Sequence, residues 1–201
     1  DKENHLDQAF RYAHYIGPFE FGLAYFNGTD RDPLFKVANG LLKPYYVQMQ
    51  QFSLDAQYIY KSWAFKLESI LKDRQSYSSY VASTVGFEYT FSNLYKGLDL
   101  GLLAEHLYDE RGATESFFDN HIFAGGRIAL NDVLGTELLA GTIIGLDDMI
   151  VQSLRLEATR RITNSWKWEL EANALLNTNS AHLNHLFSQD DYVKLALSYY
   201  L

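Results

Sequence analysis

The ten residues Tyr192-Val193-Lys194-Leu195-Ala196-Leu197-Ser198-Tyr199-Tyr200-Leu201 decide the fold class. Their odd-numbered positions are apolar or aromatic, whereas their even-numbered positions are mixed, with polar and small residues. Successive side chains of a β-strand point to opposite faces, so this alternation predicts a strand with one apolar face.

The same alternation with a period of two recurs along the whole chain. We predict about eleven strands of roughly ten residues, which is the length that crosses a bilayer at a tilt. They cover residues 6–16, 19–26, 52–60, 63–71, 84–91, 98–105, 122–131, 137–146, 154–159, 166–176 and 192–201. A helical period is not sustained anywhere, and no run of apolar residues is long enough for a transmembrane helix.

The predicted connections alternate between short and long. Short ones lie at residues 17–18, 61–62, 92–97, 132–135 and 163–165, and long ones at 27–46, 73–79, 109–121 and 177–190. Only the link around residues 147–148 departs from this rule. Short turns at one end and long loops at the other are typical of an outer-membrane barrel, with its turns in the periplasm and its loops outside the cell.

Composition excludes several other classes of protein. The 201 residues are 47% hydrophobic, which excludes disorder, and they contain no cysteine, which excludes disulfides and a thiol nucleophile. The net charge of −8 argues against nucleic acid as the main partner. Phosphate-binding and dinucleotide-binding motifs are absent, so we expect no cofactor. The length and the alternation along the whole chain predict a single domain over residues 1–201.

Aromatic residues gather on the apolar face beside the short turns. The predicted periplasmic girdle comprises Trp63, Tyr89, Phe91, Trp166, Trp168 and Tyr199. Such rings are favoured where hydrocarbon meets the lipid headgroups, so the girdle indicates a membrane boundary. The alternative is a soluble barrel with these rings inside, which does not explain why they gather at one end.

The end of the chain resembles the C-terminal assembly signal of bacterial outer-membrane barrels. Lys194 fits the polar position of that signal, Tyr199 the aromatic position and Leu201 the last position. Ala196 stands where the signal usually has Gly, and Leu201 where Phe is commoner. The stretch 98–109, the run 127–132 and the ending at 189–197 are also similar to poorly characterised porin-like proteins of the Gram-negative outer membrane. This resemblance implies lipid, lipopolysaccharide and the barrel-assembly machinery as partners.

The polar face would line the lumen of such a barrel. Its basic positions are Arg11, Lys66, Arg127, Arg155, Arg161, Lys167 and Lys194, and its acidic positions are Glu20, Asp55, Glu68, Glu88, Asp99, Glu105, Glu137, Glu157, Glu169 and Glu171. Seven basic and ten acidic groups leave a charge of −3, which favours cations weakly. We predict a constriction at Arg127, Arg155, Glu157, Arg161, Lys167, Glu169 and Glu171, with Glu157 across from Glu171. A cross-strand ion network that stiffens the wall is an equal alternative.

Other polar residues suggest weaker hypotheses. A pairing of Phe91 with Leu98 would place Ser83 opposite the outward-facing His106, an arrangement that resembles lipid-facing phospholipases. His182 and His185 lie near Asp190 and Asp191, but a solvated loop is expected there rather than a metal site. The runs 30–32 and 109–111 are expected to be solvated loop tips that contact lipopolysaccharide or divalent ions.

The leading functional hypothesis is a porin-like channel for passive diffusion of small polar solutes, without enzymatic activity. The alternative is a structural or partner-binding barrel with a plugged lumen, and a lipid-modifying enzyme that uses His106 is a third hypothesis. With eleven strands, the first and the last would run in the same direction, and a complete single-chain barrel has an even number of strands. We therefore expect this chain to be the C-terminal part of a barrel of at least twelve strands, completed by an upstream segment or a second chain.

Overall fold

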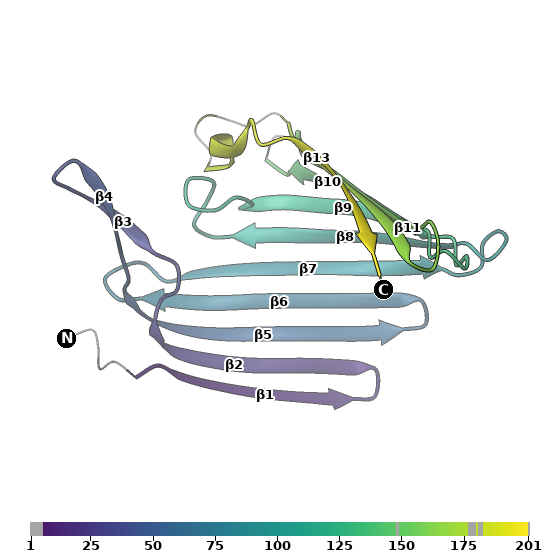
Figure 1. Cartoon of the computed structure of the whole chain (residues 1–201). Coiled ribbons are helices and arrows are strands. Elements are labelled where there is room, and N and C mark those ends of the chain that lie inside the picture. Colours follow the sequence, from purple (N-terminus) through teal and green to yellow (C-terminus); the bar gives the residue numbers. More distant parts are fainter. Residues whose placement is uncertain (1–5, 148, 177–179, 181–182, 201) are drawn as a thin grey trace.

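The computed structural model describes residues 6–147, 149–176, 180 and 183–200 (Figure 1). Eleven strands form one sheet in the order β1-β2-β5-β6-β7-β8-β9-β10-β11-β12-β13. They are β1 (Gln8–Ile16), β2 (Phe19–Thr29), β5 (Gln48–Tyr60), β6 (Trp63–Arg74), β7 (Tyr80–Phe91), β8 (Asp99–Asp109), β9 (Asn120–Ala129), β10 (Glu137–Gly145), β11 (Val151–Arg161), β12 (Trp166–Leu175) and β13 (Tyr192–Tyr199). Every neighbouring pair is antiparallel, which confirms the predicted up-and-down all-β topology.

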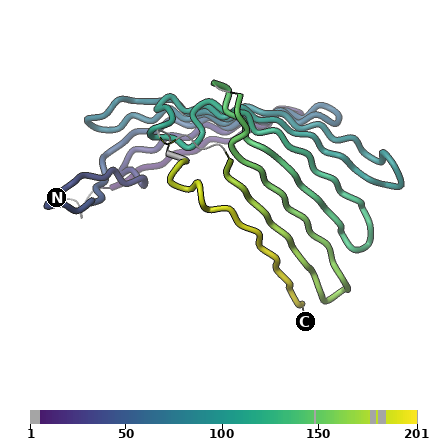
Figure 2. Tube along the Cα trace, turned by 90° about the horizontal axis from the view of Figure 1, so that it is seen from above, coloured from purple at the N-terminus to yellow at the C-terminus, as the bar shows by residue number. Residues whose placement is uncertain are grey.

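The sheet is open. Strands β1 and β13 are its two edges, and they do not pair with each other, so the described residues form an open sheet and not a closed barrel. Figure 2 shows that the sheet bends, with the C-terminal strands turned at an angle to the N-terminal ones. Because neighbouring strands alternate in direction and the sheet has eleven of them, β1 and β13 run the same way.

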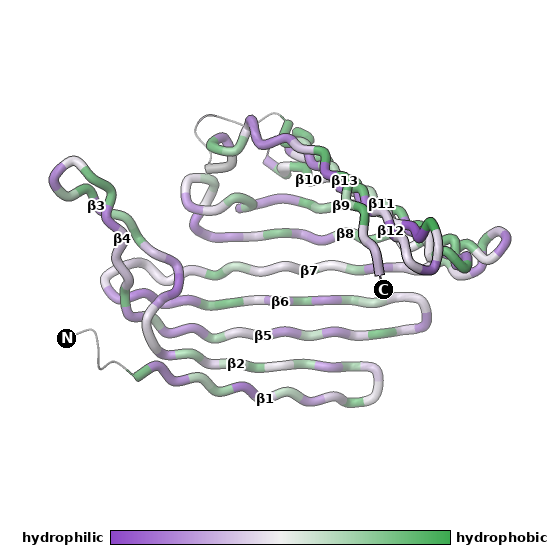
Figure 3. Tube along the Cα trace, viewed as in Figure 1, coloured by the Kyte–Doolittle hydropathy of each residue, from purple (hydrophilic) through white to green (hydrophobic). Residues whose placement is uncertain are grey.

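The two faces of the sheet differ in chemistry, because the period of two is kept in register from strand to strand. Leu23 pairs with Tyr12 on β1 and with Leu54 on β5, whereas Asp55 pairs with Gly22 and Glu68. Figure 3 shows hydrophobic and hydrophilic residues alternating along the strands. We name the side of Leu23 the apolar face and the side of Asp55 the charged face. The apolar face includes Phe10, Leu23, Leu54, Phe65, Val85, Leu102, Ala140, Leu156, Leu170 and Leu195.

Neither face is covered by a hydrophobic core. Met49, Tyr80 and Ala129 are the only buried hydrophobic residues in the described part of the chain. On the apolar face, Phe10 is 68% exposed and Leu195 is 73% exposed. The chain exposes 13732 Å², whereas a compact monomer of 23.1 kDa would expose about 9,700 Å². An exposed apolar surface of this extent is typical of a face that contacts a membrane or another protein.

The segment at residues 27–46, expected to be a long loop, contains two further strands. β3 (Leu34–Ala38) and β4 (Leu41–Tyr45) pair only with each other, so they do not change the count of eleven in the main sheet. Asn39 and Gly40 connect them with positive φ angles of 56° and 73°. This Asn-Gly pair is the typical sequence of a tight hairpin turn and was the signal for the hairpin.

The connection after β12 holds a short 3₁₀ helix, η1 (Leu183–Phe187). Within the described residues, no helix has both the length and the apolar character needed to span a membrane.

Candidate functional site

The charged face is hollowed where β9 to β13 bend. A cavity of about 550 Å³ lies on it, lined mainly by charged side chains: Arg127, Glu137, Arg155, Glu157, Glu169, Glu171 and Lys194 contribute, together with Leu139, Thr159 and Ala196. Five of the seven predicted constriction residues therefore line one hollow, and Arg161 and Lys167 lie beyond it as a directly opposed pair.

Arg155 is the centre of the ion network in this hollow. Its Nε donates to Glu157 Oε1 at 2.7 Å, and its Nη2 donates to Glu171 Oε1 at 3.3 Å. Glu157 lies directly across from Glu171, as predicted, and Arg155 stands between the two carboxylates. Glu171 also accepts from the Tyr192 hydroxyl at 2.5 Å, and its Oε2 lies 3.7 Å from Lys194 Nζ. Tyr192 was not among the predicted site residues.

The other predicted residues of this region are also engaged. Lys167 Nζ donates to Glu169 Oε1 at 2.6 Å, and Arg127 Nη2 donates to Glu137 Oε1 at 3.2 Å. Arg161 Nη1 donates to the Asn164 carbonyl at 3.3 Å. Each of the four glutamates on the charged face of β10 to β12 thus has a basic partner. This pairing favours an ion network that stiffens the wall over a constriction of unpaired charges.

A second ion pair crosses three strands at the other end of the sheet. Arg11 Nη2 on β1 donates to Asp55 Oδ1 on β5 at 3.0 Å, across the intervening β2. The pair lies flat over Gly22, where a Cβ would stand 2.6 Å from both Arg11 Nη2 and Asp55 Oδ1. The glycine therefore leaves room for the pair to lie along the wall.

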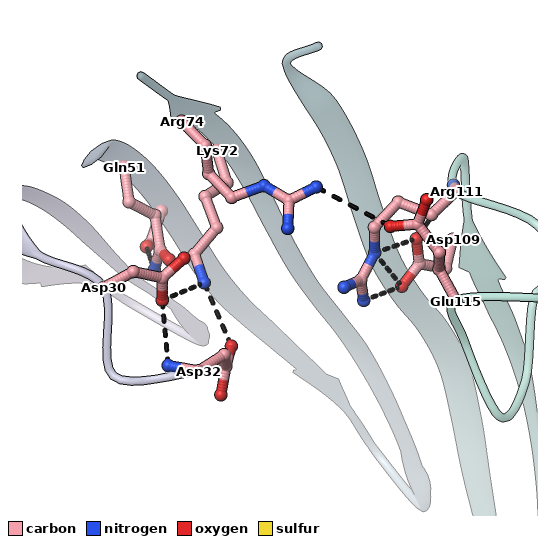
Figure 4. Close-up of polar contacts among 9 residues, drawn as sticks. Asp30, Asp32, Gln51, Lys72, Arg74, Asp109, Arg111 and Glu115 are labelled. Carbon is pink, nitrogen blue, oxygen red and sulfur yellow. Dashed lines mark hydrogen bonds and ion pairs between the residues drawn. The ribbon is translucent and has the colours of Figure 1, made fainter. Parts of the chain in front are cut away.

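Buried charges gather at the long-loop end of the charged face (Figure 4). Lys72 Nζ donates to Asp30 Oδ1 at 2.9 Å and to Asp32 Oδ2 at 3.1 Å, and the side chains of Lys72 and Asp30 are only 6% and 2% exposed. This contact holds the loop after β2 on β6. The expectation of solvated loop tips is therefore wrong for Asp30, although Arg31 and Asp32 are exposed.

The loop after β8 is held in a similar way. Arg111 binds the buried Asp109 through Nε and Nη2, and Arg74 Nη2 lies 3.7 Å from Glu115 Oε2 (Figure 4). Both guanidinium groups also lie over the ring of Tyr80, at 5.2 Å for Arg74 and 4.3 Å for Arg111. The run 109–111 is thus anchored to the sheet rather than solvated throughout.

Two long loops that follow distant strands meet through aromatic rings. The ring of Phe117, in the loop after β8, lies 5.2 Å from that of Phe187 in η1, which follows β12. In this arrangement the two loops bridge part of the long-loop end of the bent sheet.

The predicted aromatic girdle lies at the short-turn end of the apolar face. The rings of Trp63 and Tyr89 are tilted against each other with centroids 4.6 Å apart, and the ring of Tyr89 lies 4.5 Å from that of Phe91. On the last hairpin, Trp166 pairs with Tyr199 at 4.9 Å. Trp168 is on the same face and pairs with Leu197 and Arg160.

Three of the four residues in the assembly signal are on β13. Lys194 and Ala196 project from the charged face, opposite Glu171 and Glu169, and Tyr199 projects from the apolar face. Leu201, the fourth, lies outside the described residues.

The predicted pairing of Ser83 with His106 is wrong by two residues. The turn after β7 takes up residues 92–98, closed by the Asn93 N–H donating to Asp99 Oδ1 at 2.7 Å, so Phe91 pairs with Leu100. Ser83 consequently pairs with Tyr108, and His106 pairs with Val85.

His106 instead belongs to a polar chain on the apolar face. Its Nε2 lies 3.1 Å from Asn120 Oδ1, and Asn120 Nδ2 donates to Asp147 Oδ1 at 2.8 Å. Asn120 and Asp147 were missed by the sequence reasoning, because they fall in the predicted connections at 109–121 and 147–148 rather than in predicted strands. This polar chain of His106, Asn120 and Asp147 marks where the apolar face ends on the long-loop side.

The loop histidines give no metal site in the described residues. His182 lies outside them, and no group of three or more His, Asp or Glu side chains within them is arranged to hold a metal ion.

The turn between β9 and β10 is closed by Asp132. Its carboxylate accepts the Thr136 N–H at 2.7 Å and the Thr136 hydroxyl at 2.8 Å. These bonds to the charged form, the backbone bond first, lower the pKa of Asp132 from its usual value of 3.8.

Comparisons of the chain with protein-family models, with curated proteins and with solved structures found no match.

Proposed function

We propose that this chain forms part of the wall of a bacterial outer-membrane β-barrel, a porin-like channel for passive diffusion of small polar solutes. One observation carries the proposal: eleven antiparallel strands keep a continuous exposed apolar face on one side and a continuous charged face on the other. In a soluble protein, one of these faces would be packed inside. Lipid is the cover that suits a broad, smooth apolar face, and water suits the charged one.

The dimensions of the strands suit a membrane. The main strands have 8 to 13 residues, and strands of about 9–11 residues tilted by roughly 45° span the hydrocarbon core. The aromatic girdle and the polar chain at His106 mark the two ends of the apolar face. In the proposed topology the short turns are periplasmic, and the long loops with the β3–β4 hairpin are extracellular.

The two open edges require further strands. In lipid, an unpaired edge leaves backbone N–H and C=O groups unsatisfied at several kcal/mol each. β1 and β13 run the same way, so direct antiparallel closure between them is not available. Antiparallel closure takes an odd number of additional strands, giving a barrel of at least twelve, supplied by another part of the protein or by a second chain.

The charged face is the proposed lumen wall. Apart from the ion-paired groups at its long-loop end, its seven basic and ten acidic groups give a charge of −3, which favours cations weakly. The charged groups around the hollow of about 550 Å³ on this face form ion pairs with neighbours on the same wall, which supports a lumen that these side chains do not fill.

A barrel with a plugged lumen is the second candidate, and the contact between Phe117 and Phe187 favours it. Loops that meet across the mouth would restrict entry. An enzyme using His106 has less support, because Val85 rather than Ser83 stands opposite its imidazole. We expect no enzymatic activity.

Single-channel recording tests the proposal. The full-length protein, purified from its native membrane and added to a planar bilayer, should give stable ohmic steps. A Phe117→Ala variant should conduct at least as well. Silence from both proteins would overturn the channel proposal, and steps that appear only in Phe117→Ala would establish the plugged barrel instead.

A further inference from the structure

The charges of the charged face are not evenly spread over the sheet. Apart from Lys72, Arg74 and Asp109, which are ion-paired at the long-loop end, the part formed by β1 to β8 holds two basic and six acidic groups, whereas the part formed by β9 to β13 holds five basic and four acidic groups. The N-terminal part of the wall therefore carries a charge of −4 and the C-terminal part +1, so all of the excess negative charge lies on the N-terminal part. The buried charges at the long-loop end do not alter this balance, because each has an opposite partner.

Ion pairing sharpens this asymmetry. Both basic groups of the N-terminal part are taken, Arg11 by Asp55 at 3.0 Å and Lys66 by Glu88 at 3.6 Å. Glu20, Glu68 and Glu105 form no ion pair with any residue that the structure describes. By contrast, each acidic group from β10 to β12 has a basic partner within 3.3 Å.

The surroundings of Glu68 leave its charge unbalanced. It stands directly opposite Asp55 on β5 and opposite Thr84 on β7. Asp55 engages Arg11, and Lys66, which lies two residues from Glu68 on the same face of β6, engages Glu88.

Glu105 is two strands away on the same face. Its Cγ lies 2.5 Å from where a Cβ on Gly86 would stand, so its side chain rests on the bare glycine backbone of β7. Gly86 in turn pairs with Lys66, which engages Glu88. Glu68 and Glu105 thus lie near the middle of their strands, on the wall that a permeating ion would pass.

We propose that Glu68 and Glu105 determine the cation preference of the channel, and that the ion network around Arg155 does not. This inference rests on the proposed function. The two carboxylates need not bind an ion: a fixed charge at the wall attracts small hydrated cations and repels anions over about one Debye length. An ion pair 3 Å across cancels most of its own field at the distance of the permeation path.

The size of the effect follows from Coulomb's law. One elementary charge about 10 Å from a permeating ion in water, partly screened at 0.1 M salt, changes the ratio of cation to anion permeability by about two- to fourfold. Neutralising both carboxylates should therefore remove the cation preference or invert it.

The experiment uses reversal potentials of the full-length protein in planar bilayers under a KCl gradient. Glu68→Gln and Glu105→Gln should each lower the cation preference by about two- to fourfold, and Glu68→Asp should retain it. The double variant Lys167→Gln with Glu169→Gln deletes one whole ion pair of the other half and should leave the reversal potential unchanged.

A cysteine variant allows the ion selectivity to be measured before and after a charge is added to the same protein sample, since the natural chain has no cysteine. In Glu68→Cys, a thiol reagent that adds a negative charge should restore cation preference, and a neutral reagent of similar size should not. This inference alone would be overturned if the channels conduct but their reversal potential does not change in the Glu68 and Glu105 variants, or changes only when the Lys167–Glu169 pair is removed. Wild-type protein without conductance would overturn the proposed function itself.

Discussion

Placing an arginine at the same depth on each face of the sheet tests whether lipid or water covers that face. Leu156 is the middle residue of β11, five residues from each end, and its neighbours on the apolar face are Ala140 and Ala172. With a rise of about 3.3 Å per residue and a tilt of about 40°, each end lies about 13 Å away. This is half of an apolar band about 25 Å tall, so Leu156 would sit at the bilayer midplane.

Leu156→Arg should therefore cost about 2–4 kcal/mol of unfolding free energy, the range for arginine on the lipid face at the midplane. Leu139→Arg is the matched control. Leu139 projects from the charged face of β10, between Arg127 and Glu157, one position in register from the depth of Leu156. An arginine there stays in water beside a carboxylate, and we expect a change within about 0.5 kcal/mol.

Urea unfolding of the full-length protein in lipid vesicles, followed by tryptophan fluorescence, measures both values. The reasoning would be refuted if the two variants lost equal stability. A larger loss in Leu139→Arg would show that the faces are assigned backwards.

Three further outcomes follow from the structure. A cysteine in place of Ser62, in a short turn, should not react with a membrane-impermeant thiol reagent in whole cells, whereas a cysteine in place of Ala113, in a long loop, should react; the opposite labelling pattern would invert the topology. Lys72→Met should cost about 3–5 kcal/mol in the same urea assay, because it removes the cationic partner of the buried Asp30, which is 2% exposed, and adding Asp30→Leu should recover much of it; a double variant no better than the single one would contradict this. Asp132→Ala should show its full loss of stability above pH 3.8, and the difference from wild type should shrink as the pH falls below 3.8 through the lowered pKa; a difference that stays constant down to acidic pH would disprove the role of the carboxylate.

The alternation of side chains predicted most of the sheet because it depends only on local geometry. A strand that is apolar on one side must keep its register with both neighbours, since a slip of one residue reverses its faces. Because the turn after β11 is short, the pairing of Glu157 with Glu171 could be predicted from the sequence. The turn after β7 is longer, and a slip of two residues keeps the faces unchanged, so the alternation could not determine which residue stands opposite His106.

Contacts made by loops could not be predicted in this way. The burial of Lys72 against Asp30 depends on how the loop after β2 folds back onto β6, and no period in the sequence encodes that return. The partnership of Tyr192 with Glu171 was within reach, because the register of β12 and β13 places them two positions apart on one face. The sequence also could not show which charges of the wall remain without partners, since ion pairs such as Arg11 with Asp55 cross an intervening strand.

The most direct test of the membrane assignment is nitroxide accessibility along β12. Single cysteines at residues 169–174 of the full-length protein, spin-labelled in lipid vesicles, would be scanned with oxygen, which partitions into lipid, and with a water-soluble nickel complex. We predict that oxygen accessibility peaks at Leu170, Ala172 and Ala174, with nickel accessibility peaking at the alternate positions, so that the two profiles have a period of two and opposite phase. Two profiles in phase, or nickel reaching both faces equally, would contradict the assignment of the apolar face to lipid and of the charged face to a water-filled lumen.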